Sequence, residues 1–136
     1  MNVGAMNIAD SGLYFQWGDA QGYTASEVGS EGGKKYFGWE DYKYGDGTSS
    51  PNYEDMTKYS SVDNKAELDL EDDAAYMNWG GLWRTPKIGQ FYGNLRTATT
   101  GEWVSDYEGT GVSGLLLTSN DDSTKKLFFP AVGDCY

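Results

Sequence analysis

The sequence predicts an α+β domain in which two short helices and small antiparallel sheets carry long loops. Short apolar runs and alternating patterns near both ends of the chain indicate strands, whereas helical spacing occurs only in the middle. This order fits an α+β domain better than repeated βαβ units. A length of 136 residues is that of one domain, so we expect a single domain over residues 1–136.

The first 60 residues are rich in Gly, Tyr, Ser and Asp, and we expect them to form mainly loops. Leu13, Phe15 and Trp17 occupy alternate positions, which predicts one short strand ending at Gly18. Residues 36–39 are a second candidate strand. The segments 19–35 and 45–62 are long for loops of a compact domain, and such loops usually carry function.

The middle of the chain predicts two short helices. Residues 70–77 begin with acidic side chains, which complement the helix dipole, and the pattern stops before Gly80. Thr85 followed by Pro86 is typical of a helix start. The apolar face of this second helix consists of Ile88, Phe91, Tyr92 and Leu95.

The last third of the chain predicts strands. Candidate strands cover residues 102–107, 111–118 and 126–132, and the turn-forming residues 120–123 join the second to the third. We therefore expect antiparallel pairing in this part of the chain.

Composition argues against most enzyme classes. The chain has no His, which is the commonest general base and metal ligand, and its single Cys, Cys135, has no histidine to activate it. One cysteine also forms no internal disulfide. A glycosidase needs only two suitably spaced carboxylates, but among 21 acidic residues such a pair arises by chance. We expect no catalytic residues and keep a carboxylate-based glycosidase as an alternative.

Charge limits the partners. Ten basic against 21 acidic residues give a net charge of −11, which repels nucleic acid and anionic membrane surfaces. The longest apolar runs, residues 115–117 and 127–129, are far shorter than the roughly 20 residues that span a bilayer. Residues 1–10 also lack the pattern of a signal peptide. We expect no nucleic-acid partner and no membrane insertion.

A run of acidic residues invites comparison with calcium sites. Asp69, Glu71, Asp72 and Asp73 lie close together, and hard cations prefer clustered carboxylates. The EF-hand spacing is absent, and acids at a helix start on a solvated face explain the run. We therefore expect neither a metal site nor another cofactor, and calcium has no motif to support it.

The tyrosines of the long loops are the best candidates for ligand binding. Tyr interleaved with Ser, Gly and Asn is the composition of binding loops, because Tyr offers amphipathic contact area at low entropic cost. The alternative is that these rings cover a small core and expose only their hydroxyl groups. The candidate residues are Tyr23, Tyr36, Tyr42, Tyr44, Tyr53 and Tyr59.

A second set of large side chains is assigned to the structural core, because large aromatic residues are mostly buried. Trp79, Trp83 and Arg84 would alternatively form a sugar-stacking platform with a carboxylate-binding arginine. We favour the core interpretation, in which Arg84 pairs with Asp72 or Asp73. The set comprises Trp17, Trp79, Trp83, Arg84, Phe91 and Phe129.

Several segments resemble, in the same order, those of Bacteroidetes-associated proteins of the C-type-lectin-like superfold. They are residues 2–5 (NVGA), 12–18 (GLYFQWG), 72–76 (DDAAY), 78–81 (NWGG), 83–86 (WRTP), 114–119 (GLLLTS) and 127–133 (LFFPAVG). That superfold also includes formylglycine-generating-enzyme-like domains and variable receptor-binding proteins of phages. The formylglycine-generating chemistry depends on a cysteine pair, which this chain lacks.

The resemblance implies a non-catalytic adhesion module on a phage virion or a Bacteroidetes cell surface. Its partner would be a glycan or protein of a host cell. The alternative is a structural subunit of a fibre, tail or capsid decoration that mainly binds its own copies.

The chain departs from the family pattern at two places. Gln90 stands where the family has a glutamate that caps the helix, and the chain ends at Tyr136, where the family continues into further strands. The C-terminal strands of such a fold would then be missing or supplied by another chain, which favours a homo-oligomer or a completing partner. The calcium-and-sugar motifs of C-type lectins, Glu-Pro-Asn and Trp-Asn-Asp, are also absent.

Overall fold

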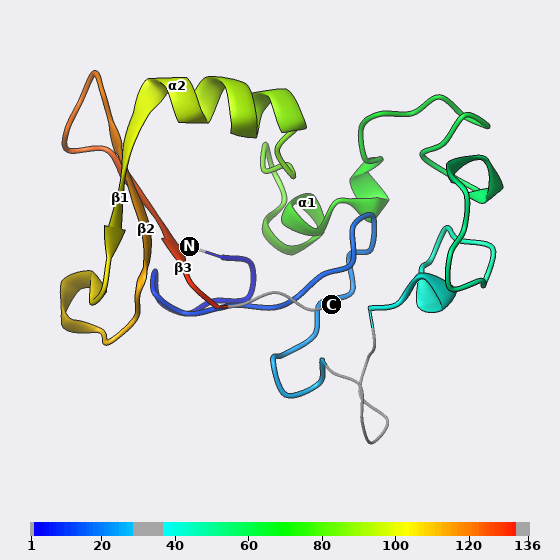
Figure 1. Ribbon diagram of the computed structural model, residues 1–136, viewed down its shortest axis with the longest axis horizontal. Coiled ribbons are helices and arrows are strands. Elements are labelled where there is room, and N and C mark those ends of the chain that lie inside the picture. Colours follow the sequence, from blue (N-terminus) through cyan, green and yellow to red (C-terminus); the bar gives the residue numbers. More distant parts are fainter. Residues whose placement is uncertain (1, 29–36, 133–136) are drawn as a thin grey trace. The chain divides into compact units, whose positions relative to one another are not determined.

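The computed structural model describes residues 2–28 and 37–132 and has a mixed α+β architecture (Figure 1). Its chain divides into two compact units. We call the first, residues 2–12 and 86–132, the sheet unit, and the second, residues 13–28 and 37–85, the loop unit. Each is described by itself.

The sheet unit contains three antiparallel strands in the order β1-β2-β3. They are β1 (Thr99–Val104), β2 (Gly114–Ser119) and β3 (Lys126–Pro130), labelled in Figure 1. The three predicted C-terminal strands are thus confirmed, with the first displaced by three residues toward the N-terminus. The predicted turn joins β2 to β3, and in it the Lys125 N–H donates to the Asp122 carbonyl at 3.0 Å.

One face of this sheet carries the core of the unit. Phe128 is buried there with Ala9 and Tyr107, and its ring stacks on that of Tyr107 with centroids 4.0 Å apart. Gly114 lies opposite Pro130 in the register. A Cβ at Gly114 would come within 2.3 Å of the Phe129 carbonyl oxygen, so only glycine permits this close approach.

The second predicted helix is present and leads directly into β1. It begins as a π-helix, Gly89–Leu95, and continues as α2 (Arg96–Ala98). Thr85 does not start it. Instead, the Gln90 side-chain oxygen accepts from the Lys87 N–H at 2.9 Å, so glutamine here makes the bond that a glutamate makes in a capping box. A short 3-10 turn, Tyr107–Gly109, follows β1.

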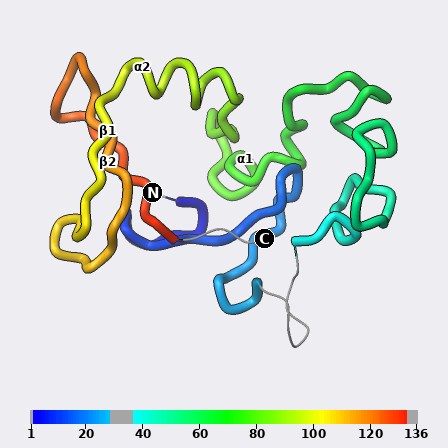
Figure 2. The backbone as a smooth tube through the Cα atoms, in the orientation of Figure 1, coloured from blue at the N-terminus to red at the C-terminus, as the bar shows by residue number. Residues whose placement is uncertain are grey.

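The loop unit has no strand among its described residues, and Figure 2 shows its chain as a series of irregular loops. The strand predicted over residues 13–17 is wrong: only Tyr14 pairs, through two backbone hydrogen bonds to Tyr23. Within the second candidate strand, Tyr36 lies outside the described residues, and Trp39 begins a 3-10 turn, Trp39–Asp41. Another such turn is Tyr53–Asp55.

The first predicted helix is present in two pieces. A 3-10 turn, Leu70–Asp72, precedes α1 (Ala74–Trp79). Asp73 separates them because its backbone is extended and its side chain accepts from the Ala75 and Tyr76 N–H groups as an N-cap. Gly80 ends α1 with a positive φ of 67°. Among the described residues, no helix has the length and apolar character needed to cross a membrane.

Candidate functional site

The loop unit contains a cavity of about 500 Å³, a size that suits a small ligand or a few sugar rings. Of the described residues that line it, most have aromatic side chains and none has a charged one. They are Gln16, Trp17, Phe37, Gly38, Trp39, Tyr42, Tyr53, Met56 and Tyr59. We call this cavity the aromatic pocket.

The rim of the aromatic pocket presents large rings to solvent. Trp17, Trp39 and Tyr53 are 49%, 51% and 55% exposed. Tyr42 and Tyr59, by contrast, are buried and belong to its interior. A ligand can therefore contact the exposed rings of Trp17, Trp39 and Tyr53, which lie next to the buried rings of Tyr42 and Tyr59.

A continuous chain of edge-to-face contacts holds these rings. Trp17 contacts Tyr59 with ring centroids 5.1 Å apart, and Tyr59 contacts Tyr44 at 5.4 Å. Tyr44 contacts Tyr42 at 6.1 Å, and Tyr42 contacts Trp39 at 5.7 Å. Such pairs stabilise specific geometries beyond the area they bury. The two exposed tryptophans are therefore positioned before any ligand binds.

Gln16 lines the aromatic pocket and has one buried polar atom without a partner. Its side-chain nitrogen donates to the Gly38 carbonyl at 3.3 Å. Its side-chain oxygen is buried and has no hydrogen-bond partner among the described residues. A buried acceptor without a donor costs about 1–3 kcal/mol.

Beneath the rings lies a buried carboxylate, Asp72, whose side chain is 2% exposed. The Tyr59 hydroxyl donates to it at 2.6 Å and accepts from the Asp69 N–H at 2.8 Å. Two ammonium groups also contact Asp72, that of Lys43 at 2.7 Å and that of Lys58 at 2.6 Å. Asp72 thus fixes Tyr59, and through it the floor of the aromatic pocket.

The surroundings of Asp72 keep it ionised. Burial alone would raise the pKa of its carboxyl group, but hydrogen bonds from two lysines and two tyrosines outweigh burial and hold the pKa well below its usual range. The pKa of Tyr59 is raised by burial first and by its bond to Asp72 second. The bond to Asp72 likewise raises the pKa of Lys43. At neutral pH Asp72 is therefore a carboxylate that contacts two ammonium groups and a neutral Tyr59 phenol.

Three carboxylates meet at this point, since oxygen atoms of Asp69, Glu71 and Asp72 lie within 4.8 Å of one another. They are the residues that would hold a cation. Lys58 already contacts all three, at 2.7, 3.7 and 2.6 Å. Lys65 adds a second ammonium group at 2.6 Å from Asp69. The lysines thus offset the negative charge of these carboxylates.

The prediction that the acidic run lies on a solvated helix face is wrong for two of its members. Asp72 and Asp73 are each 2% exposed. Asp73 does cap α1, as an acid at a helix start should, but it also accepts from the Thr85 N–H at 2.9 Å and from the Thr85 hydroxyl at 3.0 Å. It therefore ties the segment after α1 back to the start of that helix.

Of the six tyrosines predicted to bind ligand, the structure gathers four around one cavity. Tyr42, Tyr53 and Tyr59 line the aromatic pocket, and Tyr44 packs between Tyr42 and Tyr59. Tyr23 packs against a lining residue, Phe37, with centroids 5.8 Å apart. Tyr36 lies outside the described residues.

Sequence reasoning missed Gln16 and Trp39 as pocket residues. The sequence did contain an indication for Trp39, because this residue lies in a short aromatic segment next to loops whose composition is typical of binding loops. Gln16 had none, since its role depends on a carbonyl 22 residues away.

The core assignments fit the structure poorly. Trp17, Trp79, Trp83 and Phe91 are substantially exposed, so they do not form a buried core among the described residues. They form aromatic pairs at the surface of their units instead, Trp79 with Trp83 at 4.8 Å and Phe91 with Phe129 at 5.9 Å. Phe129 is half-buried.

Arg84 also differs from its prediction. It pairs with neither Asp72 nor Asp73; its guanidinium lies 4.4 Å from the centre of the Tyr76 ring and donates to the Trp83 carbonyl. Arg84 is exposed.

No protein-family model, curated protein or solved structure matches this chain.

Proposed function

We propose that this chain is a non-catalytic recognition module that binds a neutral glycan in the aromatic pocket of the loop unit. One observation carries the proposal: a preformed cavity of tyrosine and tryptophan rings, three of which are exposed to solvent. The apolar face of a sugar ring packs on such rings.

The charge of the site favours a neutral ligand. None of the described lining residues has an acidic or basic side chain, because they are aromatic, amide, thioether and glycine residues. Two described lysines beside the site, Lys43 and Lys58, are held by Asp72. An anionic sugar would therefore gain no ion pair with the described residues of the pocket, and the net negative charge of the chain would repel it.

The setting of this function follows from the resemblance to C-type-lectin-like proteins. On that basis we propose a C-type-lectin-like fold displayed on a phage virion or a Bacteroidetes cell surface, where the pocket would attach the particle or cell to a host glycan. A host protein bound by the same tyrosine-rich loops is the alternative ligand.

A glycan array followed by calorimetry tests this proposal. We expect binding to neutral glycans, and we expect Trp39→Ala to weaken it about tenfold or more, because an aromatic stacking face and its buried area are lost. Trp83→Ala is the matched control, since Trp83 is equally exposed, at 59% against 51%, but does not line the pocket. Absence of binding to any neutral glycan, or equal losses in both variants, would refute the proposal.

A second function has support from the sheet unit. Within the described residues, β1 and β3 each pair on one side only, and Trp103 of β1 is 63% exposed. Open strand edges and exposed apolar side chains favour self-association, as in a structural subunit of a virion. Size-exclusion chromatography with light scattering tests this: a stable oligomer without glycan affinity would favour the structural role, and a monomer would exclude it.

A further inference from the structure

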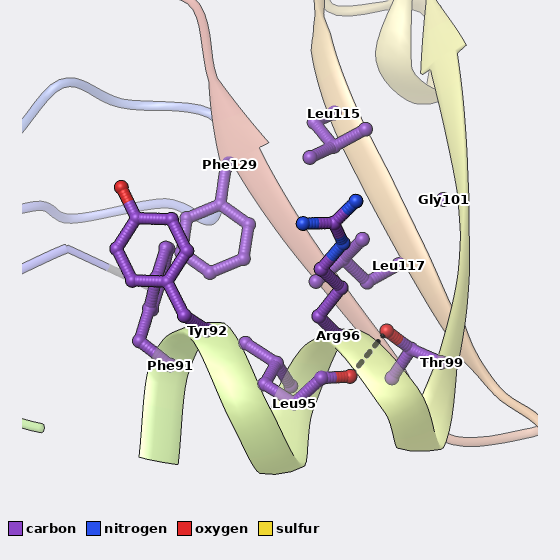
Figure 3. Close-up of a pocket in the computed structure, with 9 residues that line it drawn as sticks. All are labelled: Phe91, Tyr92, Leu95, Arg96, Thr99, Gly101, Leu115, Leu117 and Phe129. Carbon is purple, nitrogen blue, oxygen red and sulfur yellow. Dashed lines mark hydrogen bonds between the residues drawn. The ribbon is translucent and has the colours of Figure 1, made fainter. Parts of the chain in front are cut away.

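A second cavity, of about 520 Å³, lies in the sheet unit on the sheet face opposite the core (Figure 3). Phe91, Leu95 and Arg96 line it from the helical segment, and Leu115, Leu117 and Phe129 line it from the sheet. We call it the helix–sheet groove. Nothing in the proposed glycan-binding function uses it.

The register of the strands explains why the groove is apolar. Leu115 pairs with Phe129, and Leu117 pairs with Gly101, so these residues share one face of the sheet. Gly101 leaves the floor open, because a Cβ there would lie 3.2 Å from a Leu117 methyl carbon. The sheet therefore has apolar side chains on both faces, and one of these two faces packs in the core that the described residues form.

Among the described residues that line the groove, Arg96 is the one with a cationic side chain. Figure 3 shows its guanidinium extending from the helix along the sheet, beside Leu117 and toward Leu115. Among the described residues, this guanidinium makes no ion pair and no hydrogen bond. Arg96 is exposed, so its guanidinium is accessible to an anionic group of a ligand in the groove.

Further positive charge lies at one end of the groove. A smaller hollow of about 200 Å³ shares Leu95, Thr99 and Leu117 with the groove, and Lys125 and Lys126 line it. Lys125 lies 3.5 Å from Asp122, whereas no described residue forms an ion pair with Lys126. The groove thus joins an apolar floor to a local excess of cations.

We propose that the helix–sheet groove binds an apolar carboxylate, an aliphatic or aryl acid. The apolar part would lie on Leu115, Leu117 and Phe129, and Arg96 would hold the carboxylate. The planar guanidinium fork matches a carboxylate with two parallel hydrogen bonds. A neutral apolar molecule would cover the sheet equally well but would offer the guanidinium no anionic acceptor.

Calorimetric titration of the full chain with decanoate and with 1-decanol tests the proposal, because the two probes share a tail and differ in charge. We expect decanoate to bind about tenfold more tightly than decanol, a difference of one charge-assisted pair. Arg96→Gln should remove that difference by weakening decanoate alone. Arg84→Gln, at the other arginine and in the other unit, should change neither affinity.

A second variant tests the groove independently of the charge. Gly101→Val should weaken both probes at least fivefold, because its side chain would occupy the floor next to Leu117. Equal affinities for decanoate and decanol, or full decanoate affinity in Arg96→Gln, would overturn the proposal. The proposal would also be overturned if light scattering shows a dimer that neither binds decanoate nor is dissociated by it, since a second copy of the chain would then fill the groove.

Discussion

Replacing Asp72 by Asn should destabilise the loop unit strongly, because it removes the charge on which three hydrogen-bond donors converge. The amide keeps the size of the carboxylate but offers one acceptor oxygen, and Lys43, Lys58 and the Tyr59 hydroxyl all lie within 2.7 Å of Asp72 oxygens. Hydrogen bonds to a buried charged group contribute about 1.5–3 kcal/mol each.

The expected loss of stability is smaller than the summed contributions of these three hydrogen bonds. The side chains of Lys43 and Lys58 are 41% and 20% exposed, so both ammonium groups regain water when the charge is lost. We therefore expect Asp72→Asn to lower the free energy of unfolding by about 2–4 kcal/mol.

Urea denaturation followed by tryptophan fluorescence measures this loss. Asp69→Asn is the matched control, because Asp69 also contacts two lysines but is 37% exposed. Exposed ion pairs contribute little, so the control should lose about 1 kcal/mol or less. Equal losses in the two variants would show that Asp72 is not the anchor of the loop unit.

Three further predictions follow from the same contacts. Because folding lowers the pKa of Asp72, its ionised form stabilises the folded state fully above the unfolded pKa of about 4, and this stabilisation declines as the pH falls toward the folded pKa. Urea titrations of the wild type from pH 6 to 2 should show this decline in the free energy of unfolding. An equally steep dependence on pH in Asp72→Asn would contradict it. Phe128→Ala should cost about 3–5 kcal/mol, because Phe128 is 4% exposed in the core of the sheet unit; Leu127→Ala, at a half-exposed neighbour, should cost under about 1.5 kcal/mol, and similar melting shifts for the two would refute this core assignment. Gln16→Met should change the free energy of unfolding by less than about 1 kcal/mol, because it removes an unsatisfied acceptor together with the bond to the Gly38 carbonyl, while glycan affinity in calorimetry falls because Gln16 lines the pocket; undiminished affinity would exclude Gln16 from recognition.

The C-terminal strands were predictable because their signal is local. The apolar runs at 115–117 and 127–129 and the turn between them suffice to predict a hairpin, and the structure pairs Leu115 with Phe129 there. Their exact bounds depend on pairing partners, which is why β1 starts at Thr99 and not at residue 102.

The prediction of an N-terminal strand was wrong because an alternating pattern alone does not supply a partner strand. Leu13 and Phe15 do alternate with polar or amphipathic neighbours, but their side chains pack closely against Gly22, where a Cβ would come within 2.8 Å of both. That contact allows a single bridge, between Tyr14 and Tyr23, and the chain then turns away.

The candidate site was predictable in composition but not in geometry. The tyrosine-rich loops indicated binding, and four of those tyrosines do meet around one cavity. Asp72 was expected on a solvated face because its partners, Lys43 and Lys58, are 29 and 14 residues away in the sequence. Only the folded loops bring these lysines to the acid.

Nitrogen–proton correlation spectra of the tryptophan side chains during titration with a neutral oligosaccharide test the account's central claim most directly. The chain has five tryptophans, of which Trp17 and Trp39 line the aromatic pocket and the others do not. We predict that the indole signals of Trp17 and Trp39 shift saturably while those of Trp79, Trp83 and Trp103 remain in place. Shifts confined to those three, or at no indole across a panel of neutral glycans, would contradict the claim.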